Sequence, residues 1–187
     1  DVYTGFKWIA NVMRENEGKK NYIGGGEESY GFLCEDFVRD KDAVSACVIL
    51  AEIAAWAKDQ GLSLYQLLQK IYVEYGFSKE KGISVVKKGK SGAEEIEAMM
   101  KKFRENPLTE IAGSKVTYFY DYSTLKGKDY AENETVTLDM PTTSNVLQYF
   151  TEDNTKVSIR PSGTEPKIKF YCEVHSKVKS IDELPEA

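Results

Sequence analysis

The sequence is poor in the residues that bind transition metals or form disulfides. Its 187 residues include one histidine, His175, and three cysteines, Cys34, Cys47 and Cys172. The cysteines are odd in number and lack the spacing of metal ligands, so we predict neither a zinc site nor a disulfide framework. Free thiols are typical of a reducing compartment, and we therefore expect a cytoplasmic protein.

Long hydrophobic runs and an excess of positive charge are absent as well. The longest apolar run, residues 43–50, is much shorter than the roughly 20 residues of a membrane span. The 30 acidic residues outnumber the 25 basic ones, which gives a formal net charge of −5. Because nucleic acids and anionic membranes attract basic surfaces, we expect neither of them as a partner.

The composition is that of a folded protein. Hydrophobic residues make up 41% of the chain, against 5 prolines and 14 glycines, which argues against a disordered or collagen-like chain. The first residue is Asp1 rather than methionine, and no signal-peptide pattern follows it. We therefore expect the chain to be part of a longer protein.

The first part of the chain has the pattern of an α/β unit. Apolar residues at helical spacing predict a short helix over residues 6–18. The next segment predicts a strand at Tyr22-Ile23, a tight glycine loop over residues 24–26 and a second strand over 30–33. A helix over 43–57 is apolar on nearly every side, so we expect other elements to enclose it. Another helix is predicted over 63–76, with a serine cap at its start and a glycine at its end.

The second part of the chain has the pattern of an α+β domain. The capping box Ser91-Gly92-Ala93-Glu94 predicts the start of a helix, and Asn106-Pro107 predicts its end. Alternating or β-branched segments predict strands at 83–86, 116–122, 135–138, 146–150, 157–160 and 168–174. We therefore expect an α/β fragment over 1–77, followed over 78–187 by an α+β domain whose antiparallel sheet has helices on one side.

The loop between the last two predicted strands has the composition of a phosphate-binding turn. It reads Arg160-Pro161-Ser162-Gly163-Thr164-Glu165-Pro166-Lys167. A glycine between two hydroxyl residues lets the backbone N–H groups and both hydroxyls point at one anion, while Arg160 clamps it with two hydrogen bonds. Lys167 and Lys169 add positive charge on the same side of the strand. An ordinary surface turn shares the short Ser-Gly-Thr motif and is the alternative interpretation.

Two further loops carry charged residues suited to a sugar phosphate. In the glycine-bounded segment 24–31, the carboxylates of Glu27 and Glu28 and the hydroxyl of Ser29 can exchange hydrogen bonds with vicinal sugar hydroxyls. In Arg39-Asp40-Lys41-Asp42, a lysine before a helix can reach a bound anion. A solvated acidic turn and a solvated charge run are the alternatives.

In this order and spacing, the motifs resemble the α-D-phosphohexomutase family, the phosphoglucomutase/phosphomannomutase enzymes. The matching segments are Thr4-Gly5-Phe6-Lys7, Gly26 to Gly31, Arg39 to Asp42 and Arg160 to Lys169. Members of this family have four domains. The resemblance places residues 1–77 in the latter part of the third domain and residues 78–187 in most of the fourth.

The resemblance also implies a function and individual site residues. The family interconverts hexose 1-phosphate and hexose 6-phosphate through a hexose 1,6-bisphosphate intermediate. The residues implied to bind the sugar are Thr4, Glu27, Ser29 and Lys41. Those implied to hold the phosphate that is not being transferred are Arg160, Ser162, Gly163, Thr164 and Lys169.

Two parts of the family's catalytic machinery have no counterpart in the sequence. No serine stands in a Ser-His-Asn-Pro context, and no Asp-Gly-Asp-Gly-Asp run occurs. We therefore expect no catalytic residue and no metal ligand in this chain, with Mg²⁺ and the bisphosphate serving the full-length parent, whose N-terminal domains are missing here. Without a nucleophile or a metal, the chain alone is predicted to be inactive.

Two other classes of function are compatible with the sequence. One is a non-catalytic module that binds phosphosugars, and the other is a structural α+β domain whose loops are only turns. In either case, half of an α/β domain leaves apolar surface uncovered, so we expect the chain to self-associate.

Overall fold

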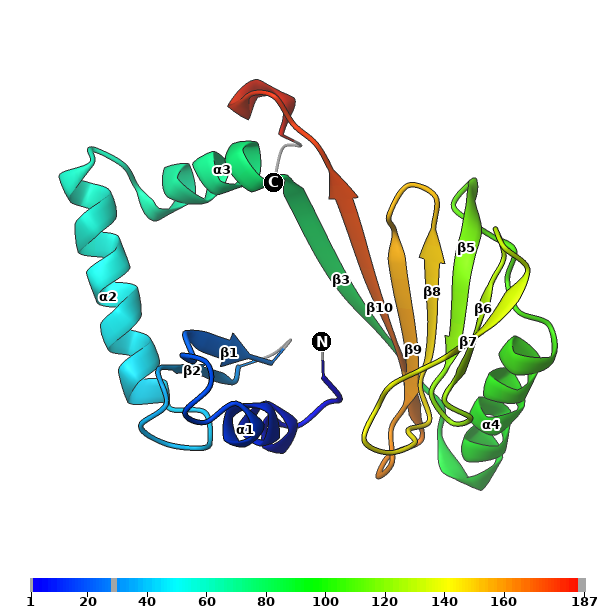
Figure 1. Cartoon of the computed structure of the whole chain (residues 1–187). Coiled ribbons are helices and arrows are strands. Elements are labelled where there is room, and N and C mark those ends of the chain that lie inside the picture. Colours follow the sequence, from blue (N-terminus) through cyan, green and yellow to red (C-terminus); the bar gives the residue numbers. More distant parts are fainter. Residues whose placement is uncertain (1, 28–29, 185–187) are drawn as a thin grey trace. The chain divides into compact units, whose positions relative to one another are not determined.

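The computed structural model describes residues 2–27 and 30–184. Contacts between Cα atoms divide the chain into two compact units, Asp1–Ile71 and Tyr72–Ala187. Figure 1 labels the elements of both units. The boundary expected between residues 77 and 78 stays a prediction.

The first unit has a small core built on its first helix. Its elements are α1 (Phe6–Glu15), β1 (Gly24–Gly26), β2 (Phe32–Cys34), α2 (Ala43–Asp59) and α3 (Leu64–Tyr75), the last of which runs into the second unit. Phe6 and Met13 from α1 bury their side chains together with Leu33 of β2. Ile9 and Tyr22 pack against this cluster.

The first strand is the glycine triplet itself and not Tyr22-Ile23, so the predictions of a strand at 22–23 and of a tight loop over residues 24–26 are wrong. Gly24 lies opposite Cys34 in an antiparallel pair, and Gly26 lies opposite Phe32. The physical reason is close packing rather than a left-handed backbone, because a Cβ atom on Gly25 would lie 2.6 Å from Tyr22 Oη.

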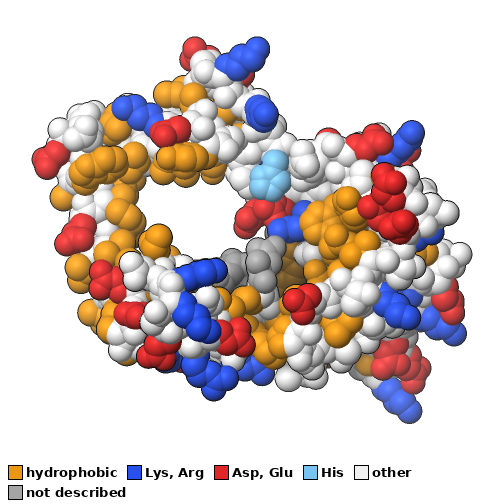
Figure 2. Space-filling model, viewed as in Figure 1, with side chains coloured by type: hydrophobic (Ala, Val, Ile, Leu, Met, Phe, Trp, Pro, Cys, Tyr) orange, Lys and Arg blue, Asp and Glu red, His pale blue; other side chains and the backbone are white. Residues whose placement is uncertain are grey.

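Helix α2 begins where its sequence predicts, but it is not enclosed as expected. The side chain of Asp42 caps the helix by accepting a 2.8 Å hydrogen bond from the backbone N–H of Ser45, which lowers the pKa of Asp42. Along the helix only Ala57 is buried, whereas Val44 is 73% exposed and Trp56 is 56% exposed. The three-residue strands β1 and β2 are too short to cover it, and hydrophobic side chains lie open over α2 and α3 in Figure 2.

The second unit is an antiparallel sheet with a helix on one face, as predicted. Its elements are β3 (Phe77–Val86), α4 (Gly89–Glu105), β4 (Glu110–Ile111), β5 (Ser114–Asp121), β6 (Lys126–Asp129), β7 (Glu134–Thr137), β8 (Leu147–Thr151), β9 (Lys156–Pro161), β10 (Lys167–Ser176) and the 3₁₀ turn η1 (Ile181–Glu183). The sheet has the order β3-β10-β9-β8-β5-β6-β7, and β4 pairs with β5. Figure 1 shows α4 beside this sheet. In the described part of the chain, no helix is long and apolar enough to cross a membrane.

The core of this unit lies between α4 and the sheet. Ile96 and Met100 of α4 pack with Leu147 and Tyr149 of β8 and with Ile159 of β9. Burial raises the pKa of Tyr149 to about 12. The apolar faces of β8 and β9 therefore meet the helix, and their alternate residues face the other way.

The start of α4 differs from its prediction. The helix begins at Gly89, after Lys88, which makes no side-chain cap hydrogen bond, so the predicted capping box at Ser91 is wrong. A Cβ atom on Gly92 would lie 2.6 Å from the backbone carbon of Lys87, so the chain before the helix folds closely over this glycine. The predicted stop is confirmed, since the helix ends at Glu105.

Candidate functional site

The phosphate-binding loop predicted between the last two strands is a turn that joins β9 to β10. Arg160 lies directly opposite Lys169 in the antiparallel register. Their chain neighbours Ile159 and Ile168 are 1% and 0% exposed, because they face the core. Arg160 and Lys169 therefore lie side by side on the face of the sheet opposite the core, where both are half-buried.

Hydrogen bonds inside the loop centre on Ser162. Its backbone N–H donates a 2.8 Å hydrogen bond to the carbonyl of Lys167, which closes the turn. Its hydroxyl oxygen accepts hydrogen bonds from the backbone N–H groups of Thr164, at 3.4 Å, and Glu165, at 3.3 Å. Gly163 is exposed at the tip. Two backbone donors thus turn toward the same hydroxyl, as in a serine turn.

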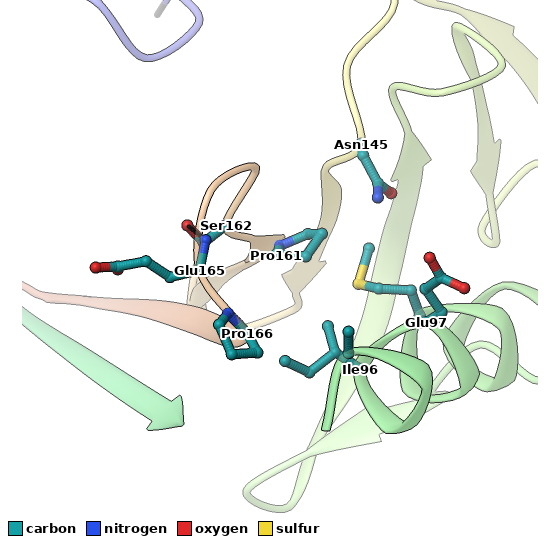
Figure 3. Close-up of a pocket in the computed structure, with 9 residues that line it drawn as sticks. Ile96, Glu97, Asn145, Pro161, Ser162, Glu165 and Pro166 are labelled. Carbon is teal, nitrogen blue, oxygen red and sulfur yellow. Dashed lines mark hydrogen bonds between the residues drawn. The ribbon is translucent and has the colours of Figure 1, made fainter. Parts of the chain in front are cut away.

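The loop is braced by the segment that leads into α4. The backbone N–H of Lys87 donates a 2.8 Å hydrogen bond to the carbonyl of Pro166. Beside the loop lies a hollow of about 160 Å³, lined by Ala93, Ile96, Glu97, Met100, Asn145, Pro161, Ser162, Glu165 and Pro166 (Figure 3). The sequence carries no signal for this bracing, because the acceptor is a backbone carbonyl, which every residue has.

The loop also contains an ion pair that the sequence does not predict. The Lys167 ammonium contacts the Glu165 carboxylate, and this hydrogen bond and charge lower the pKa of Glu165. Lys169 Nζ lies 5.6 Å from the centre of the Tyr171 ring, within cation–π range. The loop therefore combines cations with one carboxylate of its own.

In the first unit, the structure places Lys41 beside the start of α1. Lys41 Nζ lies 5.9 Å from the centre of the Phe6 ring, and Phe6 follows Thr4 by two residues. Lys41 also lies 3.2 Å from the Asp40 carboxylate, whose pKa is lowered chiefly by the backbone N–H of Lys41. Two of the residues implied to line the sugar site thus belong to neighbouring segments.

Glu27 follows β1 directly. Its backbone N–H donates a 2.7 Å hydrogen bond to the carbonyl of Gly31. A Cβ atom on Gly31 would overlap Glu27 Oε2, so the Glu27 side chain lies directly against this glycine. Ser29, together with Glu28, lies outside the described residues.

Groups that could hold a metal ion were sought among the residues that the structure describes. In that part of the chain, no three His, Cys, Asp or Glu side chains gather closely enough to do so. The donors of the loop at Arg160 to Lys169 are cations and N–H groups, which suit an anion.

Two family models match the two halves of the chain. Residues 1–75 match phosphoglucomutase/phosphomannomutase, alpha/beta/alpha domain III, and residues 83–186 match the phosphoglucomutase/phosphomannomutase C-terminal domain. The chain therefore belongs to the phosphoglucomutase/phosphomannomutase family, which confirms the resemblance of its motifs.

Curated relatives are similar along nearly all of the chain. A phosphoglucomutase of Staphylococcus haemolyticus is 38% identical over 175 residues, which are 94% of this chain and 32% of the relative. A phosphoglucomutase of Staphylococcus aureus is 39% identical over 186 residues, which are 100% of this chain and 33% of the relative. The chain thus spans about a third of the length of the relatives it matches.

A solved structure supports the fold. The crystal structure of pp63/parafusin, an exocytosis-sensitive phosphoprotein and phosphoglucomutase from Paramecium, in its open form, matches with a TM-score of 0.59 at 18% sequence identity. The match covers 97% of this chain and 30% of that one.

Proposed function

We propose that this chain is the substrate-binding part of a phosphoglucomutase or phosphomannomutase. The complete enzyme interconverts hexose 1-phosphate and hexose 6-phosphate through a hexose 1,6-bisphosphate intermediate. In this proposal the chain supplies the residues that hold the phosphate that is not being transferred, together with part of the sugar site.

The observation that carries the proposal is the pairing of Arg160 with Lys169 beside the Ser162 turn. A phosphate monoester is a dianion at neutral pH, and it is held by cations and by converging N–H donors. The 3.3–3.4 Å hydrogen bonds to the Ser162 hydroxyl are long, so a phosphate oxygen can replace this hydroxyl as their acceptor. Arg160, Ser162, Gly163, Thr164 and Lys169 would form this clamp.

The sugar contacts are proposed for the first unit. Glu27 offers a carboxylate that can bridge two adjacent hydroxyls, and Thr4, Ser29 and Lys41 would contribute further polar contacts. Because both ends of a hexose bisphosphate must occupy the phosphate clamp in turn, recognition by charge suits either orientation of the sugar.

The chemical step requires groups that we assign to other parts of the complete enzyme. We propose that a phosphoserine and Mg²⁺ outside these 187 residues transfer the phosphoryl group, and that hexose 1,6-bisphosphate turns over between two half-reactions. Positioning alone does not replace a nucleophile and a divalent cation. The chain alone is therefore proposed to bind hexose phosphates without converting them.

The binding proposal is tested by isothermal titration of glucose 1-phosphate into the chain and its variants. Replacing Arg160 by glutamine removes a charge-assisted hydrogen bond of about 1.5–3 kcal/mol, so the affinity should fall about 10- to 150-fold. Lys102→Gln removes the same charge from an exposed position on α4 and should leave the affinity unchanged. Equal binding by wild type and Arg160→Gln would refute the clamp.

The proposed inactivity is tested separately. The purified chain is incubated with glucose 1-phosphate, Mg²⁺ and glucose 1,6-bisphosphate, and glucose 6-phosphate is followed by a coupled assay. We expect no conversion, and turnover that grows with protein concentration would overturn this part of the proposal.

A further inference from the structure

The phosphate loop carries its own carboxylate among its cations. Arg160, Lys167 and Lys169 contribute three positive charges and Glu165 one negative charge, which leaves a net charge of +2. Lys167 and Lys169 are alternate residues of β10 and share one face, and Arg160 lies opposite Lys169. The total is equal and opposite to the charge of a phosphoryl dianion.

Glu165 is held to this cluster by Lys167. The two side chains form an ion pair in which Glu165 is 60% exposed and Lys167 is 30% exposed. The backbone fixes the pair, because the N–H of Lys167 donates a 2.7 Å hydrogen bond to the carbonyl of Glu165. A second acid that lines the hollow, Glu97, stands on α4, and Figure 3 shows the Glu165 side chain pointing away from it.

Resting on the function proposed above, we infer that Glu165 competes with the phosphoryl group for Lys167 and so limits the affinity of the clamp. In the structure, Lys167 is paired with Glu165. A dianion that enters must draw Lys167 away from this carboxylate and must also lie close to its negative charge. Glu165 is thus a positioning residue that acts through Lys167, and it makes the bound phosphate easier to release.

Release matters for the proposed reaction. A clamp that binds first one phosphate of a bisphosphate and then the other must release the first phosphate between the two half-reactions. Without Glu165 the net charge of the loop would rise from +2 to +3, and the loop would hold a dianion longer because the attraction grows with the charge. The carboxylate lowers this attraction without removing a donor.

The test uses sulfate as the probe, because its charge is constant across the accessible pH range. Isothermal titration at fixed ionic strength compares wild type with Glu165→Gln, Glu165→Asp and Glu152→Gln. We expect Glu165→Gln to bind sulfate about three- to tenfold more tightly than wild type. Glu165→Asp keeps the charge and should bind as wild type does. Glu152→Gln removes an equal charge from the turn between β8 and β9, at the other end of β9 from the loop, and should have no effect.

A double-mutant cycle separates competition for Lys167 from a structural role. In a Lys167→Met background, the gain from Glu165→Gln should shrink to less than half of its wild-type value, because the residue for which Glu165 competes is gone. Circular dichroism checks that each variant is folded.

The outcomes distinguish the inference from the function on which it rests. If Arg160→Gln weakens sulfate binding but Glu165→Gln binds no more tightly than wild type, the clamp stands and the role of Glu165 is refuted. If Glu165→Gln increases the sulfate affinity as much in the Lys167→Met background as in wild type, competition for Lys167 is refuted as well. If Arg160→Gln binds sulfate as well as wild type does, the phosphate clamp itself fails, and the inference fails with it.

Discussion

At the scale of single residues, an aromatic ring that lies over position 127 leaves room for glycine but not for a larger residue. A Cβ atom at this position would overlap the ring of Tyr120 and lie 3.1 Å from the Phe119 carbonyl oxygen. The ring cannot easily move, because its centre is 5.2 Å from that of Phe150. The glycine is therefore required by space rather than by its backbone angles.

We expect Gly127→Ala to destabilise the second unit by about 1–3 kcal/mol, the usual cost of overpacking. Urea denaturation followed by circular dichroism measures this change. The matched control is Gly82→Ala in β3 of the same sheet, where a Cβ atom would meet nothing within 4 Å. Equal stability of the two variants would contradict this account of Gly127.

The turn between β8 and β9 contains a carboxylate that makes stability depend on pH. The Thr151 hydroxyl, followed by the backbone N–H of Thr155, donates to Asp153 and lowers its pKa from 3.8 to about 2. Because the pKa is lowered, the ionised carboxylate stabilises the fold at pH values above 3.8, the ordinary pKa of an aspartate. This contribution disappears as the pH falls from about 3.8 to about 2.

We expect Asp153→Asn to lower the melting temperature by a few degrees at pH 7. The difference from wild type should close as the pH approaches 2, because the wild-type carboxylate then loses its charge. Thermal melts at a series of pH values measure it, with Asp139→Asn, an exposed residue, as the control. A difference that stays constant over this range would exclude the ionised Asp153 as its cause.

At the scale of elements, the two helix starts that the sequence assigned to serines have different outcomes. Before α3, the Ser63 hydroxyl accepts a 3.2 Å hydrogen bond from the N–H of Gln66, and the Gln66 side chain accepts one of 2.8 Å from the N–H of Ser63. This is a reciprocal capping box. Ser91 lies inside α4 and does not cap it.

Ser63→Ala should therefore cost about 1 kcal/mol, whereas Ser91→Ala should be neutral within about 0.5 kcal/mol. Hydrogen exchange of the helix amides provides the measurement, and a cost of this size makes the first-turn amides of α3 exchange about fivefold faster. Comparable effects of the two substitutions would show that the cap at Ser63 contributes nothing specific.

The same contrast explains how much of the fold could be predicted. Strands with one apolar face, such as β9 and β10, follow from the alternation of residues like Ile159 and Ile168. Strand β6, Lys-Gly-Lys-Asp, is not predicted by the sequence, because its residues show no apolar alternation. Its extended conformation comes from backbone pairing with β5 on one side and β7 on the other. Residues 24–26 were assigned to a loop because glycine composition does not reveal close packing against Tyr22.

The candidate site was predictable to a similar extent. The alternation of β9 and β10 predicts that Arg160 and Lys169 share a face, and the register places them opposite each other. The ion pair between Glu165 and Lys167 depends on how the loop closes through the N–H of Ser162, and local composition does not determine that closure. Side-chain pairing within a turn requires the backbone path, which the pattern of residues does not contain.

At the scale of the whole molecule, the two units differ in how well they are covered. The second unit buries a core between α4 and its sheet, whereas the first buries little beyond Phe6, Met13 and Leu33. Along α2 and α3, large side chains are exposed, among them Val48 at 54% and Leu68 at 40%. A helix that is apolar on all sides is stable only when other surfaces cover it.

We therefore expect the 187-residue chain to self-associate through α2. Sedimentation velocity should show a sedimentation coefficient that rises with protein concentration. Trp56→Glu introduces a charge at an exposed apolar position and should abolish the rise, because the charge would be buried at the contact. Lys58→Glu, at the polar end of the same helix, should leave it nearly intact, which separates loss of apolar contact from a change in net charge. A wild-type chain that sediments as a monomer at every concentration would mean that water covers this helix, and that the apolar surface of α2 does not drive association.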